Sequence, residues 1–353
     1  MQSTQKNSAI FVLGMHRSGT SALTGLLEKS GVYLGKNLLP PMKGVNEKGF
    51  FENYDIVFLH NRILEYIGSH WIDPRPLPKF DFTDNNILSF QNKLEKILCQ
   101  DLVDHTFWGV KDPRMCRLFP IWKNTIMNLG SDSNFILIFR HPDEVAESIF
   151  KRDGINKETT YISWLWHVLE SERFTRDFKR VLIFYDDLLS STTNTFNKIQ
   201  KTLQISFPNQ NFSDSFIKSS YKHHKADLEK NTSQPSKFRD LAIFLYKNIK
   251  PNKTDIFDST WNLFQQEIKN TLPFLPYLAK IAIYQEENTH LKFELNHEKT
   301  NATKQVNYRD KLIEELELKI VELNNVIQNS EIRQFSFIKI LTKIKQIFLS
   351  RVR

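Results

Sequence analysis

Residues 9–21 read Ala9-Ile-Phe-Val-Leu-Gly-Met-His-Arg-Ser-Gly-Thr-Ser21, and this stretch decides the fold of the chain. The apolar run Ala9–Leu13 predicts a buried β-strand, and the helical spacing of apolar residues from Thr20 onward predicts an α-helix. A tight loop that begins and ends with glycine joins them. Unpaired backbone N–H groups converge at such a helix start, and the helix dipole favours negative charge there. The stretch therefore predicts a binding site for a phosphate or sulfate group.

The loop keeps the glycine spacing of the common nucleotide-binding P-loop but not its chemistry. That P-loop reads G-x-x-x-x-G-K-[ST], in which the Lys reaches the terminal phosphates and the hydroxyl holds magnesium. Here Gly14 and Gly19 keep the spacing, Thr20 replaces the Lys, and Arg17 lies inside the loop. Because a guanidinium is a planar fork that matches phosphate oxygens, the loop fits a phosphate ester without a Lys–magnesium site. The alternative is a simple glycine-rich turn.

A second candidate anion site follows the apolar strand expected at Phe135–Phe139. The next residues read Arg140-His-Pro-Asp-Glu-Val-Ala-Glu-Ser148. Since Pro142 suits the first turn of a helix, Arg140 is expected at the strand end and Ser148 about two helical turns further on. A magnesium-dependent NTPase would instead need an Asp after such a strand. The alternative is an ordinary strand–helix junction with a surface Arg.

Both anion sites resemble those of sulfotransferases that use 3′-phosphoadenosine-5′-phosphosulfate (PAPS) and release 3′-phosphoadenosine-5′-phosphate (PAP). Arg17-Ser-Gly-Thr20 resembles their 5′-phosphosulfate loop, in which the tyrosylprotein branch also uses Arg. The longer string Gly14–Ala22 is similar to bacterial, polysaccharide-associated members of the family. The resemblance covers about residues 9–225, and it implies a P-loop-like fold and no required metal.

The resemblance also implies the cofactor contacts. Arg140 and Ser148 would hold the 3′-phosphate, and Tyr185, which begins a Tyr-Asp-Asp-Leu element like one in the family, would close the pocket. A core Tyr with a solvated hydroxyl is the alternative. The glycine-rich C-terminal cofactor motif of the cytosolic small-molecule branch has no counterpart, so adenine recognition is left open. The 5′-phosphosulfate would be bound by Arg17, Ser18, Gly19, Thr20 and Ser21.

Three residues are assigned catalytic roles through the same resemblance: Lys111, Arg17 and Glu52. Lys111 begins the segment Lys111-Asp-Pro-Arg114, which is similar to a family element, and would stabilise charge that develops on the sulfuryl or bridging oxygens. In the same segment, Asp112 and Arg114 would orient the substrate or pair with each other. A polar turn is the alternative for the segment.

The general base is expected in the string Asn46-Glu-Lys-Gly-Phe-Phe-Glu-Asn53, which resembles an element of the bacterial group. Glu52 is the first candidate and Glu47 the second, because desolvation beside two phenylalanines would raise a carboxyl pKa. Alternatively, Glu52 is a carboxylate that caps the start of the following helix. Less favoured candidates are His16, His60 and Asp112.

Composition excludes several classes of protein. The 353 residues are 40% apolar, enough for one sizeable α/β domain with an appendage. Two cysteines imply no disulfide framework, and neither a secretory signal nor an apolar run of about 20 residues is evident. A cytoplasmic location is expected, with the inner face of the membrane as an option. The net charge of +8 comes without a nucleic-acid motif, so no nucleic-acid partner is expected, and no ligands have zinc spacing.

Alternating strand and helix patterns predict an α/β fold, with a mostly parallel sheet flanked by helices and a C-terminal helical coiled-coil extension. The expected domains are a catalytic domain (1–280), a coiled-coil segment (281–330) and a basic amphipathic tail (331–353). Heptads over 302–327 favour a homodimer, with a single solvated helix as the alternative. The pattern over 334–353 suits a membrane surface or a partner helix, with packing on the catalytic domain as the alternative.

Strands are expected at 9–13, 107–111, 135–139 and 180–185, and helices at 20–30, 55–67, 86–99, 142–150, 161–178 and 193–203.

The functional hypothesis is sulfuryl transfer from PAPS to a hydroxyl of a carbohydrate acceptor, in a cell-surface polysaccharide or glycolipid. The rival enzyme class is a P-loop NTPase or small-molecule kinase, which the missing Lys after Gly19 disfavours. A non-catalytic scaffold that assembles through the coiled coil is the third reading.

Overall fold

The computed structural model describes residues 7–42, 46, 49–209, 236–250, 253–295, 298, 318 and 321. The chain divides into two compact units, Met1–Glu287 and Asn288–Arg353. Apart from Leu318 and Val321, the heptads of 302–327 and the basic pattern of 334–353 lie outside the described residues. The predicted dimer and membrane contacts therefore stay predictions, and all that follows concerns the first unit.

The first unit is built on a four-stranded sheet in the order β2-β1-β3-β4, and every pair is parallel. The prediction of an α/β fold with a parallel sheet is confirmed in the described residues. The register pairs Val12 with Lys111 and Leu13 with Leu137, so β1, β2 and β3 end at one edge. Ligands bind at such an edge in open α/β sheets, where the strand order reverses. The strands are β1 Ser8–Leu13, β2 Phe107–Lys111, β3 Asp132–Phe139 and β4 Lys179–Phe184.

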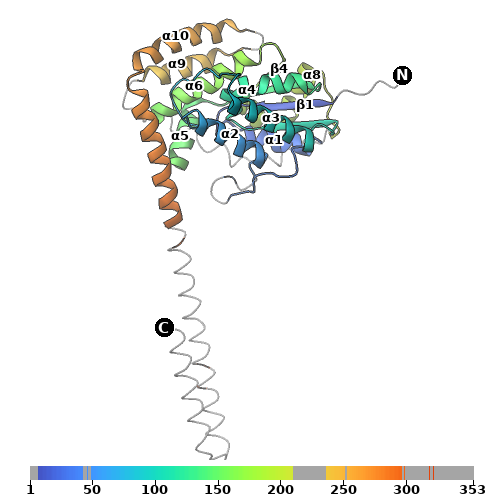
Figure 1. Ribbon diagram of the computed structural model, residues 1–353, viewed down its shortest axis with the longest axis horizontal. Helices are drawn as coiled ribbons and strands as arrows, with labels where there is room; N and C mark the ends of the chain where they lie inside the picture. The colour runs from blue at the N-terminus through green and yellow to red at the C-terminus, as the bar shows by residue number, and fades with distance from the viewer. Residues whose placement is uncertain are drawn as a thin grey trace, which may run out of the picture. The chain divides into compact units, whose positions relative to one another are not determined.

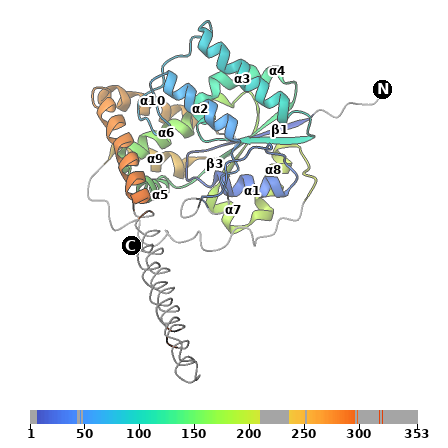
Figure 2. The same ribbon diagram turned by 60° about the horizontal axis from the view of Figure 1, so that its bottom comes forward.

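Helices cover both faces of the sheet (Figures 1 and 2). One core cluster joins Ile10 and Val12 of β1 to α1 and α8, and the other joins Phe11 to the helices on the opposite face, among them α4 and α6. This alternation follows from the two-residue period of a strand. The helices are α1 Thr20–Lys29, α2 Tyr54–Tyr66, α3 Asn85–Asp101, α4 Met115–Asn128, α5 Pro142–Asp153, α6 Lys157–Phe174, α7 Tyr185–Ser190, α8 Thr192–Leu203, α9 Lys237–Asn248 and α10 Asp255–Thr271.

Several helices differ from the sequence prediction for identifiable reasons. The predictions missed α4, which contains Pro120, and also α9 and α10. Helix α6 begins at Lys157, four residues before its expected start, because the side chain of Asn156 caps it by accepting a hydrogen bond from the Thr159 backbone N–H. Helix α6 is buried on nearly all sides, which removes the one-sided period that marks helix ends. The predicted last strand ends one residue early, since Tyr185 already begins α7.

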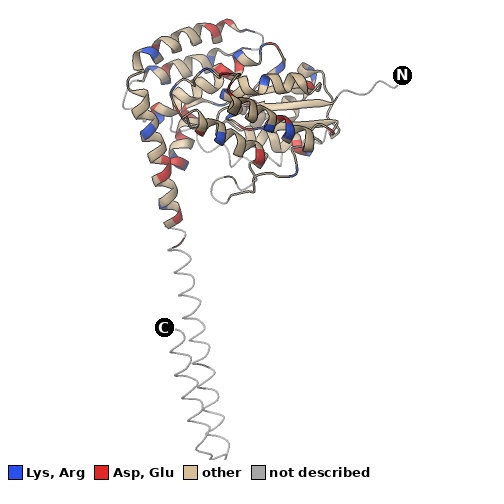
Figure 3. Ribbon diagram, in the orientation of Figure 1, with Lys and Arg blue, Asp and Glu red and all other residues tan. Residues whose placement is uncertain are grey.

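Charged side chains of both signs are interleaved over the helices of the first unit (Figure 3). None of the helices described is long and apolar enough to cross a bilayer.

Candidate anion-binding and transfer site

The loop between β1 and α1 has the backbone geometry of an anion cradle. Arg17 and Gly19 have φ angles of 66° and 90°, in the left-handed region. A Cβ atom at Gly14 would lie 2.6 Å from the backbone oxygen of Ile138, so only glycine allows β1 to end this close to β3. A Cβ atom at Gly19 would lie 2.1 Å from the ring of Tyr185, which therefore lies directly against the loop. Both glycines are required by close approaches.

Polar groups of this loop lack the partners that a closed turn would give them. No side chain caps the start of α1, where Gly19 is the N-cap residue. The hydroxyl of Ser18 is buried, with the residue 1% exposed, and has no hydrogen-bond partner in the described part of the chain. An uncapped helix start beside an unpartnered hydroxyl fits a phosphate or sulfate oxygen. The geometry is thus compatible with the 5′-phosphosulfate of PAPS.

The second anion site adjoins the first. Arg140, directly after β3, donates from Nη1 to the backbone oxygen of Arg17 at 3.0 Å, and Arg17 donates from Nε to the hydroxyl of Ser148 on α5 at 2.9 Å. Arg17 and Ser148, which the resemblance assigns to different phosphates, are bonded partners in the structure. Arg140 also donates from Nε to Glu144 at 2.8 Å and lies 5.0 Å from the Tyr185 ring centre. The loop and α5 therefore form one connected basic site.

Electrostatics favour an anion at this site. The pKa of Arg17 is lowered to about 10. Burial is the largest cause, and the positive charges of Arg152 and Arg140 contribute to the same shift. A guanidinium that is desolvated and near like charges gains from a bound anion. The site therefore has electrostatic strain that a phosphate would relieve.

Lys111 and Glu52 form a buried ion pair at the end of β2. The ammonium nitrogen of Lys111 lies 2.5 Å from Oε1 of Glu52 and 3.1 Å from the hydroxyl of Ser21, to which it donates. Lys111 is 2% exposed and Glu52 7%. The helix-cap interpretation of Glu52 is wrong, because Asn53 caps α2 by accepting bonds from two backbone N–H groups. The second base candidate, Glu47, lies outside the described residues.

The polar residues after Lys111 serve the structure of the site. Asp112 accepts hydrogen bonds from the backbone N–H and from Nη1 of Arg114, both at 2.9 Å, so these two residues pair with each other. Trp122 donates to Nε2 of His60 at 2.8 Å, so the His60 proton is on Nδ1 and is donated to Asp112 at 2.9 Å. Burial opposes the charge of Asp112, but Arg114 and His60 outweigh it and hold the carboxyl pKa far below its usual range. Neither His60 nor Asp112 is available as a base.

Two residues of this site, Glu144 and Trp71, were not predicted from the sequence. Glu144 lies four residues after Arg140 on the first turn of α5, and its i, i+4 spacing was the signal that could have paired them. Trp71 lies against the loop, with its ring centre 4.3 Å from that of His16, and no local pattern connects these distant positions. Among the described residues there is no group of three or more His, Cys, Asp or Glu that could hold a metal ion.

Comparison with known proteins gives a resemblance in fold. No model of a known protein family matches the chain. No curated protein matches it either. Among solved structures, it is similar to the sulfotransferase domain from the curacin biosynthetic pathway, with 15% identity and a TM-score of 0.40 over 70% of this chain and 100% of that chain. It is also similar to the sulfotransferase domain of the Synechococcus PCC 7002 olefin synthase, with 16% identity and a TM-score of 0.40 over 71% of this chain and 98% of that chain. A third similar structure is mouse sulfotransferase SULT7A1 complexed with PAP, with 14% identity and a TM-score of 0.33 over 79% of this chain and 88% of that chain. At such low identities and TM-scores, function must be inferred from the side chains of this chain.

Proposed function

We propose that this protein is a PAPS-dependent sulfotransferase whose acceptor is a hydroxyl group, in a carbohydrate of a cell-surface polysaccharide or glycolipid. The observation that carries the proposal is the connected basic site. It joins an uncapped helix start with the unpartnered hydroxyl of Ser18 to Arg17, Arg140 and Ser148. Two phosphate-binding elements within one site suit a nucleotide with phosphates at both its 3′ and 5′ positions.

The nucleotide would be held by groups of the loop, of α1 and of the segment between β3 and α5. Ser18, Thr20 and the backbone N–H groups at the start of α1 bind the 5′-phosphosulfate, and Arg17 neutralises it. Arg140 binds the 3′-phosphate once that phosphate competes with Glu144 for the guanidinium. Bound PAPS supplies the activated sulfuryl group.

Lys111 and Glu52 provide the chemistry of transfer. Glu52 accepts the proton of the acceptor hydroxyl as general base. Lys111 is within 3.1 Å of Ser21 on the first turn of α1, so its ammonium lies beside the phosphosulfate loop. From there it stabilises negative charge that develops on the sulfuryl or bridging oxygens. Lys111 and Glu52 are both buried, so bulk water is excluded and their electrostatic interactions with the reacting groups are stronger.

Nucleotide selectivity tests the proposal. Isothermal titration calorimetry of the full chain with PAP, ADP, and ATP with magnesium is expected to give binding of PAP in preference to both others. Preferential binding of ATP with magnesium would favour the NTPase or kinase class instead. Absence of binding by all three would favour a scaffold.

Glu52→Gln separates the base from nucleotide binding. Because a general base contributes roughly 10²- to 10⁴-fold to a rate, we expect turnover from labelled PAPS to fall by about that factor. The PAP dissociation constant is expected to change much less than turnover, since Glu52 pairs with Lys111 and is not one of the proposed phosphate-binding groups. Glu65→Gln on the exposed side of α2 is the matched control, and unchanged turnover in Glu52→Gln would refute the assignment.

A further inference from the structure

A second group of unpartnered polar atoms lies around Trp71, outside the nucleotide contacts. The rings of His16 and His70 have their centres 4.3 and 5.9 Å from that of Trp71, and the ring of His167 lies 6.2 Å from that of His16. Among the residues that the structure describes, four buried nitrogens of this group find no hydrogen-bond partner: Nε2 of His16, Nδ1 of His70, Nε2 of His167 and Nε of Arg114. Buried polar atoms are seldom left unpaired, so four at one place indicate a missing partner.

The group offers both acceptors and donors. The Nδ1 atom of His167 lies 2.7 Å from the backbone oxygen of Ser163, so it holds the proton and leaves Nε2 as an acceptor. The Nε atom of Arg114 is a donor. Burial lowers the pKa of His167 to about 3 and that of His70 to about 4, and the charge of Arg114 contributes to both. The imidazoles are therefore neutral at physiological pH.

Charged groups around Trp71 already have partners: the carboxylate of Glu286 accepts a hydrogen bond from Nε1 of Trp71 at 3.1 Å and lies 3.6 Å from Nε2 of His70. Arg114 binds Asp112 at 2.9 Å, and Arg152, which lies 5.6 Å from the Trp71 ring, binds Asp153 through two bonds of 2.7 and 2.6 Å. A carboxylate or sulfate would have to displace one of these partners. A hydroxyl group donates and accepts at once, so it satisfies an imidazole nitrogen and Arg114 without displacing any charge.

The position of the group suits the acceptor. His16 directly precedes Arg17 in the phosphosulfate loop. On the other side, the charge of Glu52 acts on Arg114, so the group also lies near the proposed base. A hydroxyl held here is close to both the donor loop and the proton acceptor.

We propose that His16, His70, His167 and Arg114 form the acceptor subsite, and that it takes the uncharged hydroxyl groups of a neutral sugar in preference to a uronate or an already sulfated sugar. This inference rests on the proposed function and deepens it, because it names the acceptor class. The imidazole nitrogens accept from sugar hydroxyls, and Arg114 donates to them. Trp71 holds the ring of His16 in place.

A matched pair of acceptors tests the subsite. The full chain is supplied with labelled PAPS and either p-nitrophenyl β-D-glucopyranoside or p-nitrophenyl β-D-glucuronide, which differ only at C6: a hydroxymethyl group in the first and a carboxylate in the second. We expect a KM at least about tenfold lower for the neutral glycoside. His16→Phe keeps a ring against Trp71 but removes Nε2, so it is expected to raise this KM about tenfold, the value of one to two hydrogen bonds. Its dissociation constant for PAP should stay unchanged.

The control variant changes a histidine that lies away from the Trp71 group. His105→Phe replaces an exposed imidazole that lies 3.7 Å from the Tyr33 ring, and it should leave all constants unchanged. His167→Phe gives a second variant of the subsite, read by the same split between KM and PAP affinity. Equal or better use of the glucuronide, or an unchanged KM in both variants, would overturn the subsite. If the unmodified chain binds PAP but transfers sulfate to neither glycoside, the group holds only water and the subsite is refuted. If the unmodified chain does not bind PAP, the proposed function is refuted instead.

Discussion

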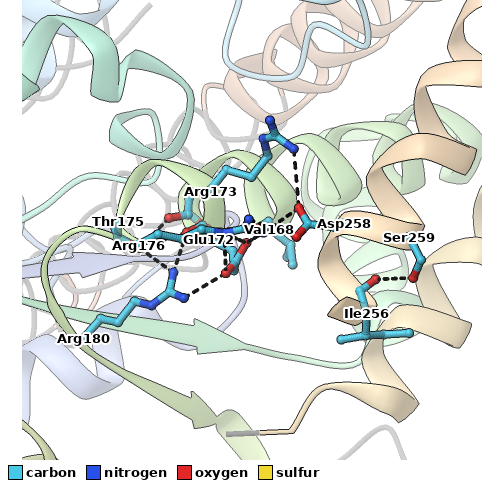
Figure 4. A network of polar contacts seen from close by, with 10 residues as sticks. Val168, Glu172, Arg173, Thr175, Arg176, Arg180, Ile256, Asp258 and Ser259 are labelled. Atoms are coloured by element: carbon cyan, nitrogen blue, oxygen red, sulfur yellow. Dashed lines mark hydrogen bonds and ion pairs between the residues drawn. The ribbon is translucent and has the colours of Figure 1, made fainter. Parts of the chain in front are cut away.

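Two buried polar regions of this molecule contrast in how completely their groups are paired. At the end of α6, Glu172 is fully buried and accepts bonds from Arg176 and Arg180, while Arg176 also donates to Asp258 of α10 (Figure 4). At the carboxyl edge of the sheet, Ser18 and His16 each have a buried polar atom without a partner. The first region ties α6, β4 and α10 together, whereas the second is incomplete.

The difference teaches which region serves stability and which serves binding. An unpartnered buried polar group costs about 1–3 kcal/mol, so a protein keeps several together only where a ligand compensates them. A complete ion-pair network leaves no such group, but it depends on every member. Substitutions should therefore lower stability in the first region and ligand affinity in the second.

The largest effect is expected from Glu172→Ala. It removes the buried carboxylate that Arg180 and Arg176 share and leaves Arg176 paired with Asp258, so the free energy of unfolding should fall by about 3–5 kcal/mol. Urea denaturation measures the loss. Asp177→Ala, which removes an exposed partner of Lys123, is the control and should change stability by less than about 0.5 kcal/mol. A loss in Glu172→Ala no larger than in the control would show that the network is not structural.

Gly19→Ala should affect the second region next. Both Gly19 and Gly68 have positive φ angles, but a Cβ atom at Gly68 meets nothing within 4 Å, whereas one at Gly19 meets the Tyr185 ring. Gly68→Ala should cost only the left-handed backbone, about 1 kcal/mol. Gly19→Ala must also displace Tyr185, so we expect a larger loss of stability and at least about a tenfold loss of PAP affinity. Identical behaviour of the two variants in calorimetry would contradict the close approach.

A smaller effect is expected in the pH dependence of stability. The pKa of buried His167 is lowered to about 3, while in the unfolded chain it is near 6.5. Between these values the unfolded state binds the extra proton, so stability falls as pH decreases from 6.5, by up to about 1.4 kcal/mol per pH unit. His167→Phe should remove this contribution, whereas the exposed control His105→Phe should keep it. Parallel profiles for His167→Phe and the unmodified chain between pH 4 and 7 would refute it.

The sequence predicts the strands well because each is a short apolar run. All four strands of the described sheet were expected, and the glycines of the loop marked the anion site. Helix α6 could not be bounded in the same way. It is buried on nearly all sides, so its apolar residues show no one-sided period from which the ends of the helix could be predicted. Contacts between distant segments were also beyond reach, since Glu52 and Lys111 lie 59 positions apart and no local pattern signals their ion pair. The hydrogen bond between Arg17 and Ser148 was not predicted for the same reason.

The central claim is that the loop after β1 and Arg140 after β3 hold the two phosphates of one nucleotide. Calorimetry of PAP and adenosine 5′-phosphate, with the unmodified chain and with Arg140→Ala, tests it most directly. We expect the unmodified chain to prefer PAP by at least about tenfold, the value of a charge-assisted bond to the 3′-phosphate. Arg140→Ala should lose this preference, because its affinity for PAP should fall much more than its affinity for adenosine 5′-phosphate. Equal losses for both nucleotides, or no preference in the unmodified chain, would contradict the claim.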